Sequence, residues 1–314
     1  MNVKINIIRL NLNNLVKLCL KDIDISVVIF YRQLFFDSKI MKHIKISEKV
    51  IFGNNLPFCI IAGPCQMESE AHSMMMAESL LKIAEKIGVP FIFKTSYDKA
   101  NRTSVEGKRG IGLKNSIPIF QKIKETFKVP VLTDIHTEEQ CREIAPFIDI
   151  LQIPAFLCRQ TDLIVAAAQT GKVVNIKKGQ FLSPQEVGNI VKKVEYCKNE
   201  RILLTDRGSS FGYNNLVVDM RSFPIMSKTG YPVIIDATHA TQMPGGMGTA
   251  SGGNRDFAPT LAKAAIATGI AGVFAEVHQD PDNAPSDGPV MLKLETFETF
   301  LKQLKAIDTV VKGF

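Results

Sequence analysis

The sequence predicts an α/β protein, a single-domain (β/α)8 TIM barrel that follows an unrelated N-terminal extension. Two observations indicate this fold class. Short apolar runs alternate with amphipathic helical patterns from residue 58 onward, and the unit occurs eight times. Each apolar run ends in polar, mostly ionisable residues, as barrel strands do at the rim that carries an active site. An open doubly wound sheet is the alternative, because periodicity alone does not close a barrel.

The apolar runs predict buried parallel strands at 58–62, 91–95, 131–134, 148–153, 173–177, 202–206, 233–237 and 272–276. The periodic segments between and after them predict helices at 69–87, 115–127, 137–146, 161–170, 184–198, 215–229, 257–269 and 294–312. Gly88 follows the first helix, at a position where a left-handed residue commonly ends a helix. Strict alternation of strand and helix requires right-handed crossovers between parallel neighbours.

Residues 1–40 do not share this pattern and are rich in Asn, Ile, Leu and Lys. Their longest apolar run, 25–31, is too short to cross a membrane, and charged residues break up any export signal. We therefore expect 1–40 to be a disordered extension or a translated segment upstream of a start at Met41. We expect 41–314 to be the catalytic barrel domain.

The net charge of +7 is modest for 314 residues and is spread along the chain. This distribution favours small anionic ligands and gives no support to nucleic acid as a partner. The six cysteines lack CxxC or framework spacing, so we expect a reducing, cytoplasmic environment and no disulfide scaffold.

Several strand ends supply cations, namely Lys94, Lys99, Arg102, Lys177 and Arg207. They suffice for two phosphates and a carboxylate, which predicts small phosphorylated acids or sugars as substrates. Asn101 and Ser104 add neutral hydrogen-bonding groups, and Asp134 and Gln152 end the third and fourth strands. In a barrel these ends converge on one mouth.

Four further residues form a candidate metal site: Cys65, His239, Glu276 and Asp287. They offer soft, borderline and hard donors that suit Zn²⁺, Fe²⁺ or Mn²⁺. None lies at a short ligand spacing, and a buried small hydrophobe is the alternative interpretation of Cys65. The glycine-rich stretch 243–256 suits a lid over bound ligand, with an exposed flexible loop as the alternative.

The resemblance to a known family rests on long motifs in a fixed order, among them IAGPCQMES, FKTSYDKANRTS, NIKKGQFLSP, DATHATQMPGG and FAEVHQDPDNAPSDGP. Over residues 41–314 the chain resembles the 3-deoxy-D-manno-octulosonate 8-phosphate synthases. This resemblance implies a homotetrameric barrel that condenses phosphoenolpyruvate with D-arabinose 5-phosphate and water, for lipopolysaccharide biosynthesis. Cys65 in the GPC motif resembles the metal-dependent class of the family.

The resemblance also assigns roles to individual residues. It implies metal ligands at Cys65, His239, Glu276 and Asp287. It implies phosphoenolpyruvate contacts at Lys94, Lys99, Lys177 and Arg207, with Gln152 nearby. For the sugar phosphate it implies Asn101, Arg102 and Ser104, with Arg159 supplied by a neighbouring subunit. The residues that it places in a catalytic role are Lys94, Lys99, Asp134, His239 and Asp287.

Two alternatives to this activity remain at the level of sequence. A related enzyme, 3-deoxy-7-phosphoheptulonate synthase, uses erythrose 4-phosphate and usually carries a Lys-Pro-Arg motif. This chain has Lys99-Ala100-Asn101-Arg102 there, and an Asn amide can bind a sugar hydroxyl that a proline side chain cannot, which favours the longer sugar. The other alternative is a barrel that has lost catalysis and only binds ligands.

Overall fold

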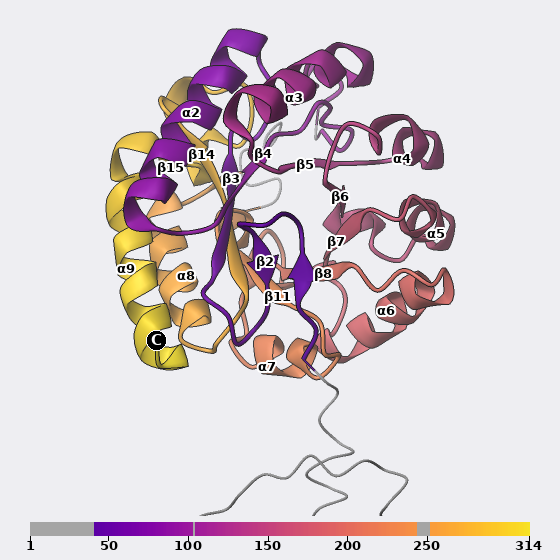
Figure 1. Ribbon diagram of the computed structural model, residues 1–314, viewed down its shortest axis with the longest axis vertical. Helices are drawn as coiled ribbons and strands as arrows, with labels where there is room; N and C mark the ends of the chain where they lie inside the picture. The colour runs from indigo at the N-terminus through magenta and orange to yellow at the C-terminus, as the bar shows by residue number, and fades with distance from the viewer. Residues whose placement is uncertain (1–40, 103, 244–251) are drawn as a thin grey trace, which may run out of the picture. The chain divides into compact units, whose positions relative to one another are not determined.

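The computed structural model describes residues 41–102, 104–243 and 252–314. The predicted extension 1–40, and 244–251 of the predicted lid, lie outside the described residues. Eight parallel strands of the described chain form a ring (Figure 1): β3 (Cys59–Gly63), β4 (Phe91–Lys94), β5 (Val131–Asp134), β6 (Ile150–Ile153), β7 (Val173–Lys177), β8 (Ile202–Asp206), β11 (Val233–Asp236) and β14 (Gly272–His278). β11 pairs with both β8 and β14, which closes the ring. The predicted barrel is confirmed, and the open sheet is excluded.

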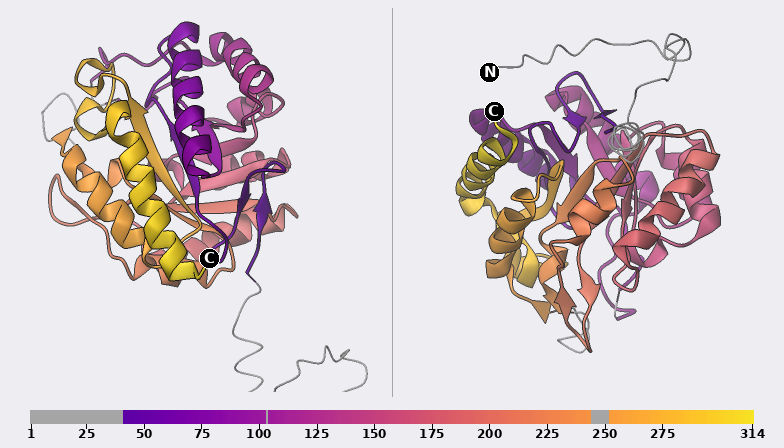
Figure 2. Two further views of the ribbon diagram at one scale, coloured as in Figure 1. Left: turned by 60° about the vertical axis from the view of Figure 1, so that its left-hand side comes forward. Right: turned by 90° about the horizontal axis from the view of Figure 1, so that it is seen from below.

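Helices surround the strands on all sides (Figure 2): α2 (Glu70–Ile87), α3 (Leu113–Phe127), α4 (Glu138–Ile144), α5 (Thr161–Gln169), α6 (Val187–Tyr196), α7 (Ser222–Ser227), α8 (Ala258–Ile266) and α9 (Leu294–Lys312). Gly88 ends α2 in the left-handed conformation, as expected. Among the described residues, no helix combines the length and apolar character needed to cross a bilayer.

The helix predicted at 215–229 is wrong in its first half. Leu216–Val217 (β10) instead pairs with Ser209–Ser210 (β9) in a short antiparallel hairpin, and the helix begins only at Ser222. The β-branched pair Val217 and Val218 favours extended backbone. The Asp219 carboxylate accepts the backbone N–H of Arg221, which stabilises a local turn before the helix.

The amino-terminal end of the barrel is covered by a hairpin of β1 (Ile44–Lys45) and β2 (Ile51–Phe52). The Phe52 ring is fully buried against the start of β14, where a Cβ on Gly272 would lie 2.9 Å from it. From the end of α9, Lys312 Nζ donates to the carbonyls of Leu56 and Ile270, each at 2.7 Å. The barrel is therefore closed at this end, and ligands must enter from the carboxyl ends of the strands.

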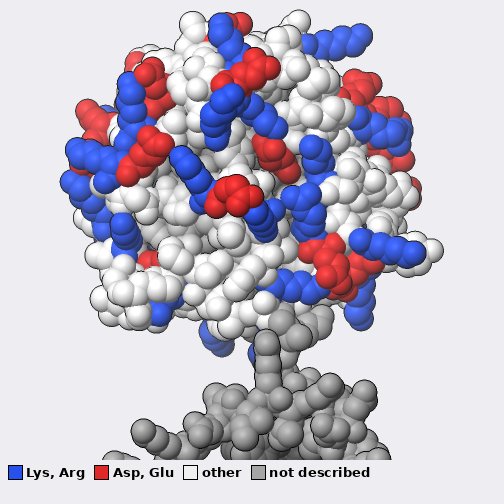
Figure 3. All heavy atoms as spheres, viewed as in Figure 1, with Lys and Arg blue, Asp and Glu red and all other residues white. Residues whose placement is uncertain are grey.

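Charged side chains of both signs are interspersed on the face seen in Figure 3. This face shows no large area of a single sign. It agrees with the spread of charge along the sequence.

The contact between β3 and β4 requires a glycine at the end of β3. A Cβ on Gly63 would lie 1.9 Å from the carbonyl oxygen of Lys94 and 2.9 Å from its carbon. The backbone of Lys94 cannot move away from an added Cβ as the end of a flexible side chain could. Gly63 thus lets the chain bring Lys94 beside the loop that carries Cys65.

We predict that Gly63→Ala lowers the free energy of unfolding by about 1–3 kcal/mol, because it overpacks a backbone contact. Gly188→Ala is the matched control, since Gly188 lies in α6 with nothing within 4 Å of an added Cβ. The control should be neutral or slightly stabilising. Urea unfolding of both variants tests this, and equal stabilities would contradict the account of β3.

Candidate active site

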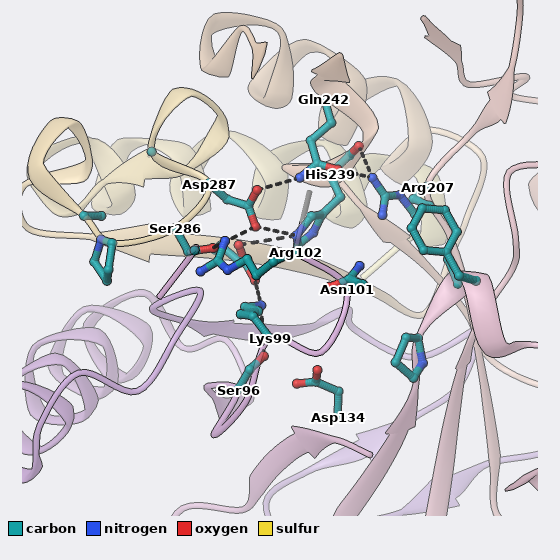
Figure 4. Close-up of a pocket in the computed structure, with 18 of the residues that line it drawn as sticks. Ser96, Lys99, Asn101, Arg102, Asp134, Arg207, His239, Gln242, Ser286 and Asp287 are labelled. Atoms are coloured by element: carbon teal, nitrogen blue, oxygen red, sulfur yellow. Dashed lines mark hydrogen bonds and ion pairs between the residues drawn. The ribbon is translucent and has the colours of Figure 1, made fainter. Parts of the chain in front are cut away.

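One cavity of about 540 Å³ opens at the carboxyl ends of the strands (Figure 4). Most predicted site residues line it: Lys94, Lys99, Asn101, Arg102, Ser104, Asp134, Gln152, Lys177, Arg207, His239, Glu276 and Asp287. In Figure 4, Asp287, Ser286 and Arg102 gather on one side of the opening, and Arg207 and Asp134 lie on other sides. The cavity therefore joins the predicted cations to the predicted metal ligands.

The candidate metal ligands meet at one edge of this cavity. Asp287 Oδ2 accepts a hydrogen bond from the Cys65 thiol at 3.0 Å, and one donor atom each from Cys65, Glu276 and Asp287 lie within 4.8 Å of one another. His239 Nε2 lies 3.4 Å from Glu276 Oε2 and 3.8 Å from Asp287 Oδ2. Three of the four predicted ligands thus form one group, and the fourth adjoins two of them.

Asp236 orients the imidazole of His239. Its Oδ2 lies 2.8 Å from His239 Nδ1, and its Oδ1 accepts the backbone N–H of His239 at 3.0 Å. A carboxylate at Nδ1 holds the proton there and leaves the Nε2 lone pair directed at the cluster, the usual arrangement for a metal-binding histidine. His239 is therefore prepared to act as a ligand through Nε2.

The donor set fits a divalent cation. Glu276 Oε2 is buried and has no hydrogen-bond partner among the described residues, which is costly for a carboxylate oxygen. Burial, followed by the charges of Asp287 and Glu276, raises the pKa of the Cys65 thiol well above its usual value. A bound cation would satisfy the free oxygen and stabilise the thiolate, because metal ligation deprotonates a thiol.

Two lysines lie beside the cluster. Lys94 is buried, and its Nζ donates to Glu276 Oε1 at 2.5 Å and to the carbonyl of Cys65 at 3.1 Å. Lys99 Nζ donates to Ser96 Oγ at 3.0 Å and lies 3.8 Å from Glu276 Oε1. Glu276 thus faces the metal cluster with one oxygen and the lysines with the other.

A third lysine, Lys177, forms a buried ion pair with Asp236 Oδ2 and lies 3.7 Å above the centre of the Phe274 ring. Burial lowers the pKa of Lys177, and the charge of Asp236 acts against that shift. Arg207 Nη2 donates to the carbonyl of His239 at 3.1 Å and to Gln242 Oε1. Arg207 Nε is buried without a partner among the described residues, so the guanidinium can bind a further anion.

Arg102 is held at the rim by three acceptors. Its Nη1 donates to Ser286 Oγ at 2.8 Å, its Nη2 to Gln66 Oε1 at 2.7 Å and its Nε to the carbonyl of Lys108 at 2.8 Å. Its neighbours Asn101 and Ser104 line the same rim. This segment can therefore bind a ligand near the entrance, away from the buried lysines.

The floor of the cavity carries Asp134 and Gln152. Asp134 Oδ2 lies 3.1 Å from His136 Nε2. Burial lowers the pKa of His136, but its hydrogen bond with Asp134 and the charge of that carboxylate outweigh burial and raise it overall. Gln152 Oε1 accepts from the Asn175 amide at 3.0 Å, which leaves the Gln152 NH₂ group for a ligand.

The structure adds residues that sequence reasoning did not assign to the site. Gln242 Nε2 donates to Asp287 Oδ1 at 2.8 Å while its Oε1 accepts from Arg207, so it links a candidate metal ligand to a cavity cation. Its only sequence signal is its place after the seventh strand. Arg159, predicted to act across a subunit boundary, is exposed and lies outside the cavity lining.

A second group of possible ligands, Glu68, His72 and His278, lies near the carboxyl end of β14. His278 Nδ1 accepts the backbone N–H of Asp280 at 3.0 Å, which places the imidazole proton on Nε2. That nitrogen then donates to Glu68 Oε1 at 2.8 Å. This group is a hydrogen-bonded pair next to a histidine, so we assign no metal to it.

Comparison with protein families matches residues 41–313 to the DAHP synthetase I family. The chain belongs to this family.

A Chelativorans sp. (strain BNC1) member, called 2-dehydro-3-deoxyphosphooctonate aldolase, is 58% identical over 265 residues, or 84% of this chain and 96% of that protein. A Rickettsia prowazekii (strain Madrid E) protein of the same name is 55% identical over 272 residues, or 87% and 99% of the two chains. The Rhodopseudomonas palustris (strain TIE-1) protein, also so named, is 56% identical over 268 residues, or 85% and 93%. The match to the DAHP synthetase I family includes every residue of the cavity described above.

Proposed function

We propose that this protein is an enzyme that condenses phosphoenolpyruvate with D-arabinose 5-phosphate and water. The products are 3-deoxy-D-manno-octulosonate 8-phosphate and inorganic phosphate, for lipopolysaccharide biosynthesis. We assign the reaction to the barrel domain, 41–314.

The observation that carries this proposal is the similarity to relatives of one name over nearly their whole length, 96% in one case and 99% in another. That name denotes the synthase family that the sequence motifs resemble, so the resemblance is confirmed. The cavity supports the same function, because it places cations for two phosphorylated substrates around one opening.

We assign phosphoenolpyruvate to the inner part of the cavity. Lys94, Lys99, Lys177 and Arg207 surround that space, and their N–H donors suit one phosphate and one carboxylate, although Lys94 and Lys177 also pair with Glu276 and Asp236. The free Arg207 Nε and the Gln152 NH₂ group supply further donors there. Arabinose 5-phosphate takes the outer part, with Asn101, Arg102 and Ser104 as contacts.

The reaction needs a carbon–carbon bond between C3 of phosphoenolpyruvate and the sugar aldehyde carbon. The aldehyde oxygen takes up a proton, and water adds to C2 and loses one. The C2–O bond to the phosphate then breaks while the new C2 hydroxyl loses its proton and becomes the keto group, and inorganic phosphate leaves with that proton. The cations hold two anions in attack geometry and stabilise the leaving phosphate, and Asp134 and His136 lie on the floor as groups able to accept or donate a proton.

We propose that Cys65, His239, Glu276 and Asp287 hold one divalent metal ion, Zn²⁺, Fe²⁺ or Mn²⁺. When bound, such an ion supplies a Lewis acid that polarises or orients an oxygen of substrate or water. Asp236 keeps the His239 lone pair directed at the ion, and Lys94 balances the charge of Glu276. Gln242 fixes the second oxygen of Asp287.

We further propose that the protein is a cytoplasmic homotetramer. Arg159 would then reach the sugar phosphate bound by a neighbouring subunit, which agrees with its exposed position outside its own cavity. The partners are the two substrates alone, without nucleic acid and without membrane insertion.

The description of the family, DAHP synthetase I, keeps one alternative open, namely condensation with erythrose 4-phosphate. Asn101 lines the cavity, so its amide is placed to bind a hydroxyl that only the longer sugar offers. We therefore favour the five-carbon sugar.

Phosphate release from phosphoenolpyruvate, measured with each sugar phosphate, tests the function. We predict a kcat/KM about 5- to 150-fold higher with arabinose 5-phosphate, because a lost hydrogen bond of this kind costs roughly 1–3 kcal/mol. Lys177→Met should lower the rate about 100-fold or more, since it removes a charge that stabilises the reacting anion. A preference for erythrose 4-phosphate would establish the alternative, and no turnover with either sugar would leave only a binding protein.

Metal content tests the proposed site separately. We predict about one divalent ion per wild-type chain and almost none in Cys65→Ala, because the substitution removes one of the four proposed ligands. Cys158→Ala is the control, since that thiol is buried outside the cavity. Mass spectrometry of the purified proteins gives the stoichiometry. Full turnover after chelation, with no ion left, would contradict the assignment.

A further inference from the structure

Lys178 is a fully buried lysine that the proposed chemistry does not use. It follows directly after β7, and its backbone N–H continues the ladder by donating to the carbonyl of Thr205 at 2.7 Å. Successive side chains of a strand point to opposite faces. Lys177 lines the cavity, so Lys178 faces away from it, and its side chain is only 1% exposed.

The ammonium of Lys178 is enclosed by oxygens of two loops. In the loop after β7 it lies 3.2 Å from the carbonyls of Gly179 and Leu182. In the loop after β8 it lies 3.2 Å from the carbonyl of Gly208 and 3.3 Å from Ser209 Oγ. A lysine has three N–H donors, so the two loops share all of its hydrogen-bonding capacity.

Asp206, the last residue of β8, balances the charge of Lys178 at 3.3 Å. Its Oδ1 also accepts the backbone N–H of Gly208 at 2.9 Å, and its Oδ2 accepts from Ser222 Oγ at the start of α7. Both members of the pair are 1% exposed. The pair therefore links β7, β8 and α7 behind the cavity wall.

The two loops that Lys178 joins carry cavity residues. Gln180 lies in the first loop, and Arg207 lies between Asp206 and Gly208 in the second. The backbone N–H of Ser210 donates to the carbonyl of Gln180 at 2.9 Å, which is a further link between the loops. The position of the Arg207 backbone thus depends on contacts made by a residue outside the cavity.

We propose that Lys178 is a positioning residue, which holds the loops after β7 and β8 so that Arg207 and Gln180 face the anion site. This inference rests on the proposed function for its kinetic consequence only. Stability alone does not explain a buried ion pair, because replacing one by apolar groups is often neutral or stabilising. A role in holding the two loops does explain the buried lysine, because its ammonium binds backbone carbonyls from both of them.

The test compares Lys178→Met with Lys192→Met, a control at an exposed lysine of α6. Hydrogen–deuterium exchange of the ligand-free proteins reports the loops without any assumption about the reaction. We expect the amides of 180–182 and 208–210 to exchange at least tenfold faster in Lys178→Met. Amides of the barrel strands should keep their wild-type rates, and the control should match wild type throughout.

The kinetic arm measures both substrates. We expect the KM for phosphoenolpyruvate to rise at least tenfold in Lys178→Met, with kcat and the KM for arabinose 5-phosphate within about threefold of wild type. A purely structural role would instead lower the amount of active enzyme and leave both KM values unchanged. Asp206→Asn keeps the side-chain volume and should also raise the KM for phosphoenolpyruvate. This variant replaces Lys178→Met in the test if Lys178→Met does not fold.

Unchanged loop exchange in both variants would overturn the proposal, and so would equal changes in the two KM values. Absence of turnover by the wild-type enzyme would instead refute the proposed function. In that case loop exchange and the calorimetric affinity for phosphoenolpyruvate still decide the role of Lys178.

Discussion

Two buried pairs of lysine and carboxylate, Lys94 with Glu276 and Lys177 with Asp236, organise the carboxyl end of the barrel. A buried charge is costly unless it is paired, so each lysine fixes the place of its carboxylate. Each carboxylate also contacts the candidate metal ligands. Glu276 directs its Oε2 at this group, and Asp236 orients the imidazole of His239. The cavity lysines and the candidate metal ligands therefore share two supporting carboxylates, Glu276 and Asp236.

The alternation of side chains along the strands extends this arrangement to the outer face of the barrel. At the ends of β7 and β8 the inner side chains, Lys177 and Arg207, line the cavity. Their neighbours in the chain, Lys178 after Lys177 and Asp206 before Arg207, form a third buried pair on the other face. We propose that Lys177 and Arg207 contact the bound anion, and that Lys178 and Asp206 hold the loops that carry Gln180 and Arg207.

The sequence alone predicted the eight strands, and most of the site residues that it predicted line the cavity, because polar residues at strand ends of a barrel must converge. It did not predict the bridging role of Gln242, since nothing in a local pattern marks an amide that joins two strand ends. The predicted start of α7 was wrong, because pairing with Ser209–Ser210, just before the predicted helix, decided the conformation of Leu216 and Val217. Contacts between segments, rather than periodicity, account for both.

In the proposed active site, Asp236 supports the bound anion through Lys177 and the bound metal through His239. The most direct measurement is calorimetry on Asp236→Asn, with the affinities for phosphoenolpyruvate and for the divalent ion taken from the same preparation. An Asn amide presents an N–H group to Lys177 or to His239, so both affinities should fall, by about tenfold or more for the metal. If either affinity stays within twofold of wild type, the two sites do not share this support and the account is contradicted.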